Sequence, residues 1–199
     1  MGTSTLLDII GSMVVFGMLL LIVLQVNDSG TANSFTYTFD LLVQENLVAV
    51  VDLVEYDFRR LGYCADPTKI PDPSKSIIAA DSTSITFLTD VNDDGVLDTM
   101  KYYTGPTSEL ASTPNPNDRF LYRVVNNETP IGTNLGVTAF NLLYFNAQGD
   151  TIHFPISVPG EIYTMQISIT VENIASYDTT YSTAFWRQVR LVSRNLNNR

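Results

Sequence analysis

Two hydrophobic patterns follow one another in the first part of the chain. The run Ile9–Val26 reads IIGSMVVFGMLLLIVLQV and is apolar at almost every position. With Leu6 and Leu7 it approaches the roughly 20 residues that a helix needs to cross the hydrocarbon core of a bilayer. We therefore expect residues 1–30 to form an apolar helix suited to a membrane or to the core of a filament.

Beyond Asn27–Gly30 the apolar residues recur at steps of three and four, which predicts an amphipathic helix over residues 31–62. Gly62 is the predicted stop, and the Asn27–Gly30 segment is a predicted kink or melted turn between the two helical stretches. The apolar stripe comprises Phe39, Val43, Leu47, Val50, Val54, Phe58 and Leu61. The acids Asp40, Glu45, Asp52, Glu55 and Asp57 are assigned to the polar positions.

From residue 63 to residue 199 the pattern changes to short segments rich in Val, Ile, Thr, Tyr and Phe, separated by Gly, Pro, Asn and Asp. This composition is typical of half-buried strands. The predicted strands are Ser84–Leu88, Thr99–Tyr103, Arg119–Val124, Val137–Phe145, Thr151–Ile156, Ile162–Val171 and Ala184–Val192. We expect an α+β fold, in which one antiparallel sheet forms a head against the amphipathic helix.

The charge of the chain excludes some functions. Its 199 residues carry a formal net charge of −10, with 21 acids against 11 bases, so nucleic acid is not an expected partner. The single histidine, His153, and the single cysteine, Cys64, cannot supply a His-based catalytic triad or a zinc cluster. We expect no enzymatic activity, and we expect Cys64 to be a buried structural residue.

Asp8 is the first residue that needs an explanation, because no Lys or Arg precedes Arg59. A carboxylate at the entrance of a membrane-length helix is costly and is usually paired or functional. One interpretation is structural: Thr5 as N-cap and Asp8 three residues on form a capping box. The other is functional: Asp8 meets a positive group on a neighbouring chain.

An Asp-rich segment between two predicted strands is the sharpest candidate for metal binding. Oxygen-bearing side chains stand at positions one, three, five and nine of the loop, as Asp90, Asn92, Asp94 and Asp98, and glycine stands at position six. This spacing matches the first part of a calcium-binding loop. Position twelve is Lys101 where such loops have Glu, and a tight hairpin favours the same residue types. Both a calcium site and a plain hairpin are therefore open.

The flanks of the apolar run bear on topology. Met1–Thr5 has no basic residue, and no small-residue cleavage site follows Val26, so a cleaved signal peptide is not expected. We expect the helix to be retained as an anchor. A polar head of about 170 residues is then expected outside the cytoplasm, although no flanking basic residue marks the orientation.

The order of these features resembles that of type IV pilin-like proteins, especially the larger minor pilins and pseudopilins of the W and J kinds. The similar segments are Leu6-Leu7-Asp8-Ile9-Ile10, Asp57–Tyr63, Phe87–Tyr103, Val137–Gly149 with Ile162–Val171, and Val189–Leu196. The leader differs, since only Met1-Gly2 would be removed, which leaves Asp8 sixth where the family has Glu fifth.

The resemblance implies a structural subunit of a type IV pilus-like or type II secretion-like filament, in the bacterial cell envelope. The helix would anchor the chain in the inner membrane and then pack against copies of itself or related subunits. By resemblance, Asp8 would pair with the N-terminal amine of a neighbouring subunit. The implied filament-core contacts are Leu19, Leu20, Leu21, Ile22 and Leu24.

Two other functions compete with the repeating filament subunit. One is a membrane-tethered module outside the cytoplasm that binds calcium or polysaccharide, which filaments containing this chain would exclude. The other is a tip or initiating subunit present in few copies, which the number of copies per filament would distinguish.

Overall fold

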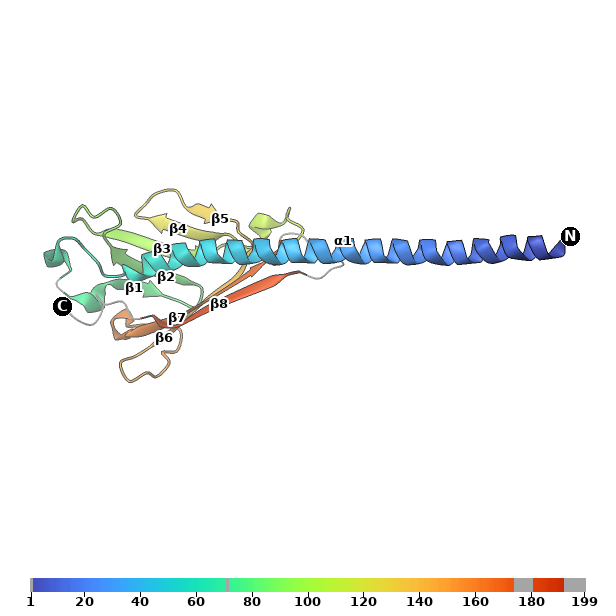
Figure 1. The fold of residues 1–199 in the computed structure, drawn as a ribbon. Helices are drawn as coiled ribbons and strands as arrows, with labels where there is room; N and C mark the ends of the chain where they lie inside the picture. The colour runs from blue at the N-terminus through green and yellow to red at the C-terminus, as the bar shows by residue number, and fades with distance from the viewer. Residues whose placement is uncertain (1, 71, 174–180, 192–199) are drawn as a thin grey trace. The chain divides into compact units, whose positions relative to one another are not determined.

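The computed structural model describes residues 2–70, 72–173 and 181–191. Tertiary contacts divide the chain into two units, residues 1–39 and residues 40–199. Helix α1 is the first element of the chain, and all the strands come after it (Figure 1). The regular elements are α1 (Thr3–Arg59), β1 (Ile77–Ala80), β2 (Ser84–Thr89), β3 (Asp98–Thr104), β4 (Leu121–Val125), β5 (Ile131–Thr133), β6 (Val137–Phe145), β7 (Thr164–Glu172) and β8 (Thr183–Leu191).

Helix α1 passes through Asn27–Gly30 without the expected break. The low helix propensity of Asn and Gly is a weak preference that neighbouring turns override, and the Thr31 hydroxyl donates back to the Asn27 carbonyl at 2.9 Å. The helix ends at Arg59, three residues before the predicted stop. Gly62 adopts φ +71° and donates its N–H to the Leu88 carbonyl at 2.8 Å.

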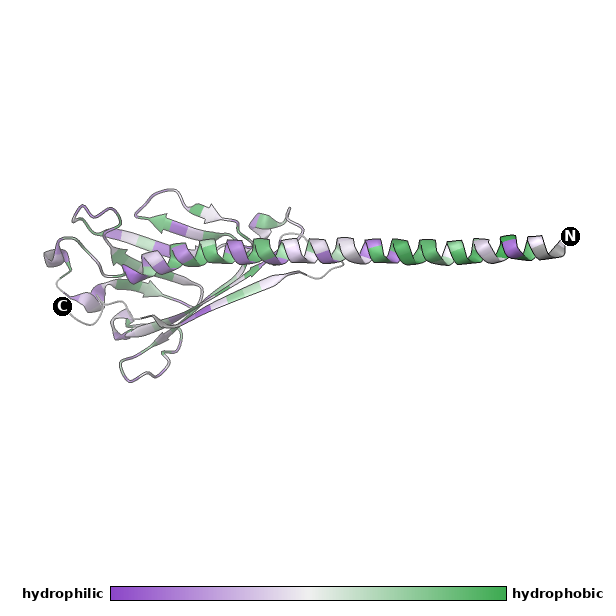
Figure 2. Cartoon of the chain, in the orientation of Figure 1, coloured by the Kyte–Doolittle hydropathy of each residue, from purple (hydrophilic) through white to green (hydrophobic). Residues whose placement is uncertain are grey.

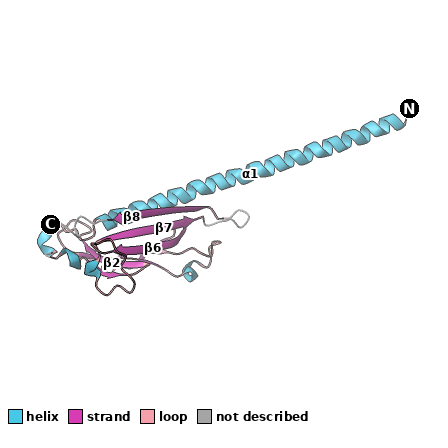
Figure 3. Ribbon diagram, turned by 90° about the horizontal axis from the view of Figure 1, so that it is seen from below, coloured by secondary structure: helices cyan, strands magenta, loops and turns pink. Residues whose placement is uncertain are grey.

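The head contains two antiparallel sheets, so the prediction of a single sheet is wrong. Five strands form one sheet in the order β1-β2-β3-β4-β5, and three form the other in the order β6-β7-β8. Strands β6, β7 and β8 lie side by side as one layer (Figure 3). The α+β class is confirmed, with the sheet divided into two layers.

The predicted strands are largely present, with three differences. Strands β1 and β5 were not expected, because runs of four and three residues carry too few alternations to stand out. The segment Thr151–Ile156 forms only an isolated bridge, Phe145↔Thr151, since Pro155 cannot donate to a ladder. Val192, at the end of the last predicted strand, lies outside the described residues.

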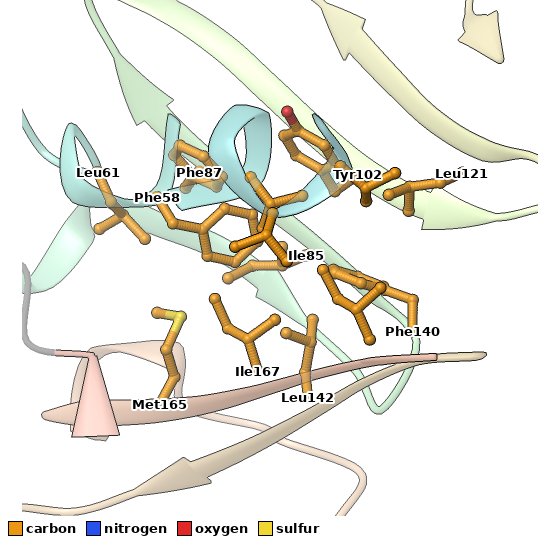
Figure 4. Packing of buried hydrophobic residues seen from close by; sticks show 14 of the residues in the cluster. Phe58, Leu61, Ile85, Phe87, Tyr102, Leu121, Phe140, Leu142, Met165 and Ile167 are labelled. Carbon is orange, nitrogen blue, oxygen red and sulfur yellow. The ribbon is translucent and has the colours of Figure 1, made fainter. Parts of the chain in front are cut away.

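The core of the head forms around Phe58, at the end of α1 (Figure 4). The Phe58 ring is fully buried. Its centroid lies 5.4 Å from the ring centroids of Phe87 in β2 and Tyr102 in β3, and 6.4 Å from that of Phe140 in β6. Both sheets therefore pack against the same helical residue. Within this unit α1 is a core helix, buried through Val43, Val50, Val51, Val54 and Phe58.

Candidate assembly surface

Among residues 1–39, the side chains that the structure describes bury almost none of their apolar surface. Figure 2 shows the hydrophobic residues along this part of α1, and none of its most apolar stretch is buried within the chain. By length and composition this helix can cross a membrane. The predicted filament-core residues Leu19, Leu20, Leu21, Ile22 and Leu24 are between 47% and 66% exposed.

These exposed residues do not form one stripe. An α-helix turns 100° per residue, so Leu19, Leu20, Leu21 and Ile22 point in four different directions around it. A helix that is apolar all round needs an apolar surrounding on every side, either lipid or other helices. The chain itself supplies no such surrounding for residues 1–39 among the residues that the structure describes.

Asp8 lies inside the helix, and the capping-box interpretation is wrong. Helix α1 begins at Thr3 with no acid in its first turn, and the Thr5 hydroxyl donates to the Gly2 carbonyl at 3.3 Å. Thr5 is therefore a helical residue and not the N-cap. With its capping role removed, the exposed carboxylate of Asp8 needs another explanation.

Several hydroxyl groups of this segment donate to backbone carbonyls within the helix. Ser12 donates to the Ile9 carbonyl at 2.9 Å, and Thr36 donates to the Ala32 carbonyl at 3.0 Å. Such backbone bonds make hydroxyl side chains tolerable in an apolar setting. Asp8, by contrast, has no ion pair with any residue in the described part of the chain. It is the one charge at the apolar run.

The Asp-rich loop is organised around Asp90, which is fully buried. Its carboxylate accepts the backbone N–H groups of Ala65 at 3.1 Å, Asp94 at 3.2 Å and Gly95 at 2.9 Å. Burial acts to raise the pKa of Asp90, but these backbone donors outweigh it and hold the pKa below its ordinary value. The carboxylate thus serves as the acceptor around which the loop folds.

The carboxylates of two other predicted ligands, Asp94 and Asp98, also accept bonds within the loop or beside it. Asp94 accepts from the Val96 N–H at 2.7 Å and from the Asn92 amide at 2.9 Å. Asp98 accepts from the Val91 N–H at 3.0 Å and from the Asn126 amide. Within the described residues, no group of three or more His, Cys, Asp or Glu could hold a metal ion. The calcium site stays a prediction, and these bonds favour the hairpin interpretation.

Arg60 attaches this loop to the end of α1. Its guanidinium donates to the Asp90 carbonyl and to the Asp93 carboxylate at 2.8 Å. It also lies 5.4 Å from the Tyr56 ring centroid and 5.0 Å from that of Tyr63, within the range of cation–π attraction. Arg60 thereby fixes the Asp-rich loop to the end of the helix.

Asp57 is the main residue that the sequence pattern misplaced. It was assigned to the polar face, yet it is only 3% exposed. Its carboxylate accepts from Arg123 of β4 at 2.6 and 3.3 Å and from the Tyr102 hydroxyl of β3. The bond to Asp57, which outweighs burial, raises the pKa of Arg123. We call the group of Asp57, Arg123 and Tyr102 the Asp57 clamp. Its only signal in the sequence is an acid at the edge of the apolar stripe.

Comparison with protein families, curated proteins and solved structures finds no match for this chain.

Proposed function

We propose that this chain is a structural subunit of a type IV pilus-like or type II secretion-like filament in the bacterial cell envelope, and that it assembles through its N-terminal helix. One observation carries the proposal. The same helix, α1, presents an uncovered apolar surface over its first part and builds the core of a folded head with its last part. Before assembly, lipid would cover the apolar part; in a filament, sister helices would replace lipid.

The exchange of lipid for helices explains why a charge matters. Lipid tails are as apolar as leucine, so hydrophobic burial does not favour one surrounding over the other. Close packing and polar pairing must supply the difference. Asp8 is the charged side chain at the apolar run, and a positive group on a neighbouring subunit would form an ion pair with it.

The Asp57 clamp supports a mechanical role for the last part of α1. The clamp joins the helix to β3 and β4, while Phe58 joins it to both sheets. Residues 40–59 are thereby held in the head by apolar packing and by a buried ion pair. A filament subunit needs such attachment, because force on the head must reach the helix that holds the subunit in place.

The proposal is tested by the Asp8→Ala variant, with Asp28→Ala as the matched control. Both changes remove one exposed carboxylate from the first unit, but only Asp8 lies at the start of the apolar run. A charge-assisted bond is worth about 1.5–3 kcal/mol, so we expect the yield of sheared filaments containing this chain to fall at least about tenfold in Asp8→Ala. Negative-stain microscopy and mass spectrometry of the shear fraction provide the measurement.

Two results would overturn the proposal. One is a filament yield in Asp8→Ala equal to that of the unmodified chain and of Asp28→Ala. The other is recovery of the chain only from the membrane fraction, with none in filaments. Counting copies per filament in the same fraction separates a repeating subunit from a tip subunit.

A further inference from the structure

Asp118 carries a buried carboxylate without a partner. The residue is 1% exposed, and neither carboxylate oxygen accepts a hydrogen bond from a residue that the structure describes. The nearby Thr113 hydroxyl lies 2.9 Å from the Leu110 carbonyl and 3.1 Å from the Asn115 carbonyl, and these are the acceptors for its single proton. A buried charged group without a hydrogen bond is strongly unfavourable. Either a proton or a bound cation must neutralise this group in the folded protein.

A second carboxylate, that of Glu172, lies in the same region of the head. Arg119, the residue after Asp118, donates its N–H to the Val137 carbonyl at 2.9 Å, and Glu172 donates its N–H to the Gly136 carbonyl at 2.8 Å. Asp118 and Glu172 thus flank the same short segment. Burial raises the pKa of Asp118 more than the nearby hydroxyl lowers it, and the negative charge of Glu172 raises it further.

Two asparagines bring further amide groups to this region. Asn115, only 1% exposed, donates to the Glu172 carboxylate at 3.0 Å. Asn134 follows β5 and has a buried amide oxygen without a partner in the described residues. Strand β5 pairs with β4 through Leu121↔Thr133, so Asn134 lies on the segment beside Asp118–Leu121. Three unpartnered buried oxygens therefore come from two adjacent segments.

No basic side chain neutralises the pair. Neither Asp118 nor Glu172 forms an ion pair with any Lys, Arg or His in the described ranges. The neighbouring cation, Arg119, donates to the Gly105 carbonyl at 3.2 Å instead. No basic side chain in the described ranges therefore neutralises the negative charge of Asp118 and Glu172.

We infer that Asp118, Glu172 and Asn134 belong to a binding site for a hard divalent cation of the calcium class. Carboxylate and amide oxygens are the ligands that Ca²⁺ takes, in a coordination shell of six to eight with flexible geometry. Asp118 could supply two of these oxygens. Asp118 differs in this respect from the carboxylates of the Asp90–Asp98 loop, which already accept bonds from their own backbone and amide neighbours.

A cation here would join parts of both sheets. Asp118 precedes β4 and Asn134 follows β5 in the five-stranded sheet, whereas Glu172 ends β7 in the three-stranded sheet. With only two carboxylates, the site is expected to be weak, with a dissociation constant on the order of 10⁻⁴–10⁻³ M. Binding to the folded state alone would raise the melting temperature with calcium concentration.

Thermal melts of the full chain in detergent micelles test the inference, with and without CaCl₂ and with NaCl of equal ionic strength. We expect calcium to raise the melting temperature of the unmodified chain. Asp118→Asn should lose this response, and in a chelator it should melt above the unmodified chain, because the orphaned charge is gone. Glu172→Gln should weaken the apparent affinity for calcium at least about tenfold. Asp94→Asn, in the other acidic loop, is the control and should keep the full response.

Two outcomes would overturn the inference. One is the absence of any calcium-specific shift in the unmodified chain up to about ten times the expected dissociation constant, which would mean that Asp118 is neutralised by a proton. The other is a response lost in Asp94→Asn and kept in Asp118→Asn, which would place the ion in the Asp90–Asp98 loop. If Asp118→Asn fails to fold, calorimetric titration of the unmodified chain and of Glu172→Gln decides between the same alternatives.

Discussion

At the scale of single residues, two buried carboxylates stabilise the head by accepting hydrogen bonds from two different kinds of donor. Asp57 binds side chains, those of Arg123 and Tyr102, whereas Asp90 binds backbone N–H groups. Desolvation of a charge is offset only when its hydrogen bonds are complete. Removing a hydrogen-bonding partner from either carboxylate therefore leaves a buried charge whose desolvation free energy is no longer offset.

Asp57→Ala should destabilise the head strongly, because Arg123 would be left partly buried without its counter-charge. Loss of one partner from a buried ion pair costs about 3–5 kcal/mol. Since the Arg123 side chain is 22% exposed, we expect the lower end of this range. Denaturant unfolding of the full chain in micelles provides the measurement.

Asp52→Ala is the control for Asp57→Ala, since Asp52 is exposed on the same helix. Its free energy of unfolding should stay within about 0.5 kcal/mol of the unmodified value. Equal effects of the two substitutions would contradict the assignment of the Asp57 clamp.

The lowered pKa of Asp90 predicts that its contribution to the stability of the protein is lost at low pH. Its pKa is lower in the folded protein than the ordinary value of 3.8, so its contribution to stability is present above that value and is lost as the pH falls through the folded pKa. The unmodified chain should melt above Asp90→Asn at about pH 6, and the gap should narrow towards about pH 2. A gap that stays constant with pH would contradict this account of the carboxylate.

At the scale of secondary-structure elements, the connection between β5 and β6 is a point of close backbone approach in the head. Gly136 has φ +72°, and a Cβ placed on it would lie 2.2 Å from the Glu172 carbonyl oxygen. Both the left-handed backbone and the close approach of β7 require glycine there. This single residue lets the two sheets meet next to Asp118.

Gly136→Ala should therefore destabilise the protein by at least about 3 kcal/mol. Gly149→Ala is a matched control, because Gly149 also has positive φ, +88°, but nothing lies within 4 Å of its Cβ position. That change should cost only the backbone strain, about 1–2 kcal/mol. Denaturant midpoints of the two variants test the difference, and equal midpoints would refute the close-contact argument.

The sequence predicted elements well where a long periodic pattern existed. The apolar run, the amphipathic stripe and β6 are found at or near their expected bounds, because many positions report the same period. The division into two sheets could not be predicted, since strand pairing depends on contacts between distant segments. Asp57 and Asp118 were missed for the same reason: Arg123 and Glu172, which define their surroundings, lie far away in sequence.

The candidate site was predictable only in part. The exposure of Leu19–Leu24 follows from a run apolar on all sides, and the structure agrees. The helix begins three residues before the start that the capping box implied, Thr3 where Leu6 was expected, and this removed the capping box. Helix starts are set by local backbone bonds that a hydrophobic pattern does not encode.

At the scale of the whole molecule, charge and hydrophobicity are unevenly distributed. Residues 1–58 contain no Lys or Arg, and their acids leave them negative, while the bases lie between Arg59 and Arg199. A helix with these properties does not attract its own copies by charge. Under the proposed function, association of copies would therefore depend on close packing of the apolar part and on an ion pair between Asp8 and a positive group of a neighbouring subunit.

The central claim is that the apolar surface of α1 packs against other such helices, and cysteine cross-linking tests it most directly. Leu20→Cys places a thiol on the exposed apolar surface, while the native Cys64 is buried and serves as the background in the unmodified chain. Oxidation of the sheared material should give disulfide-linked dimers from Leu20→Cys and only monomer from the unmodified chain. Monomer alone from Leu20→Cys, in both the membrane and the sheared fractions, would contradict the account.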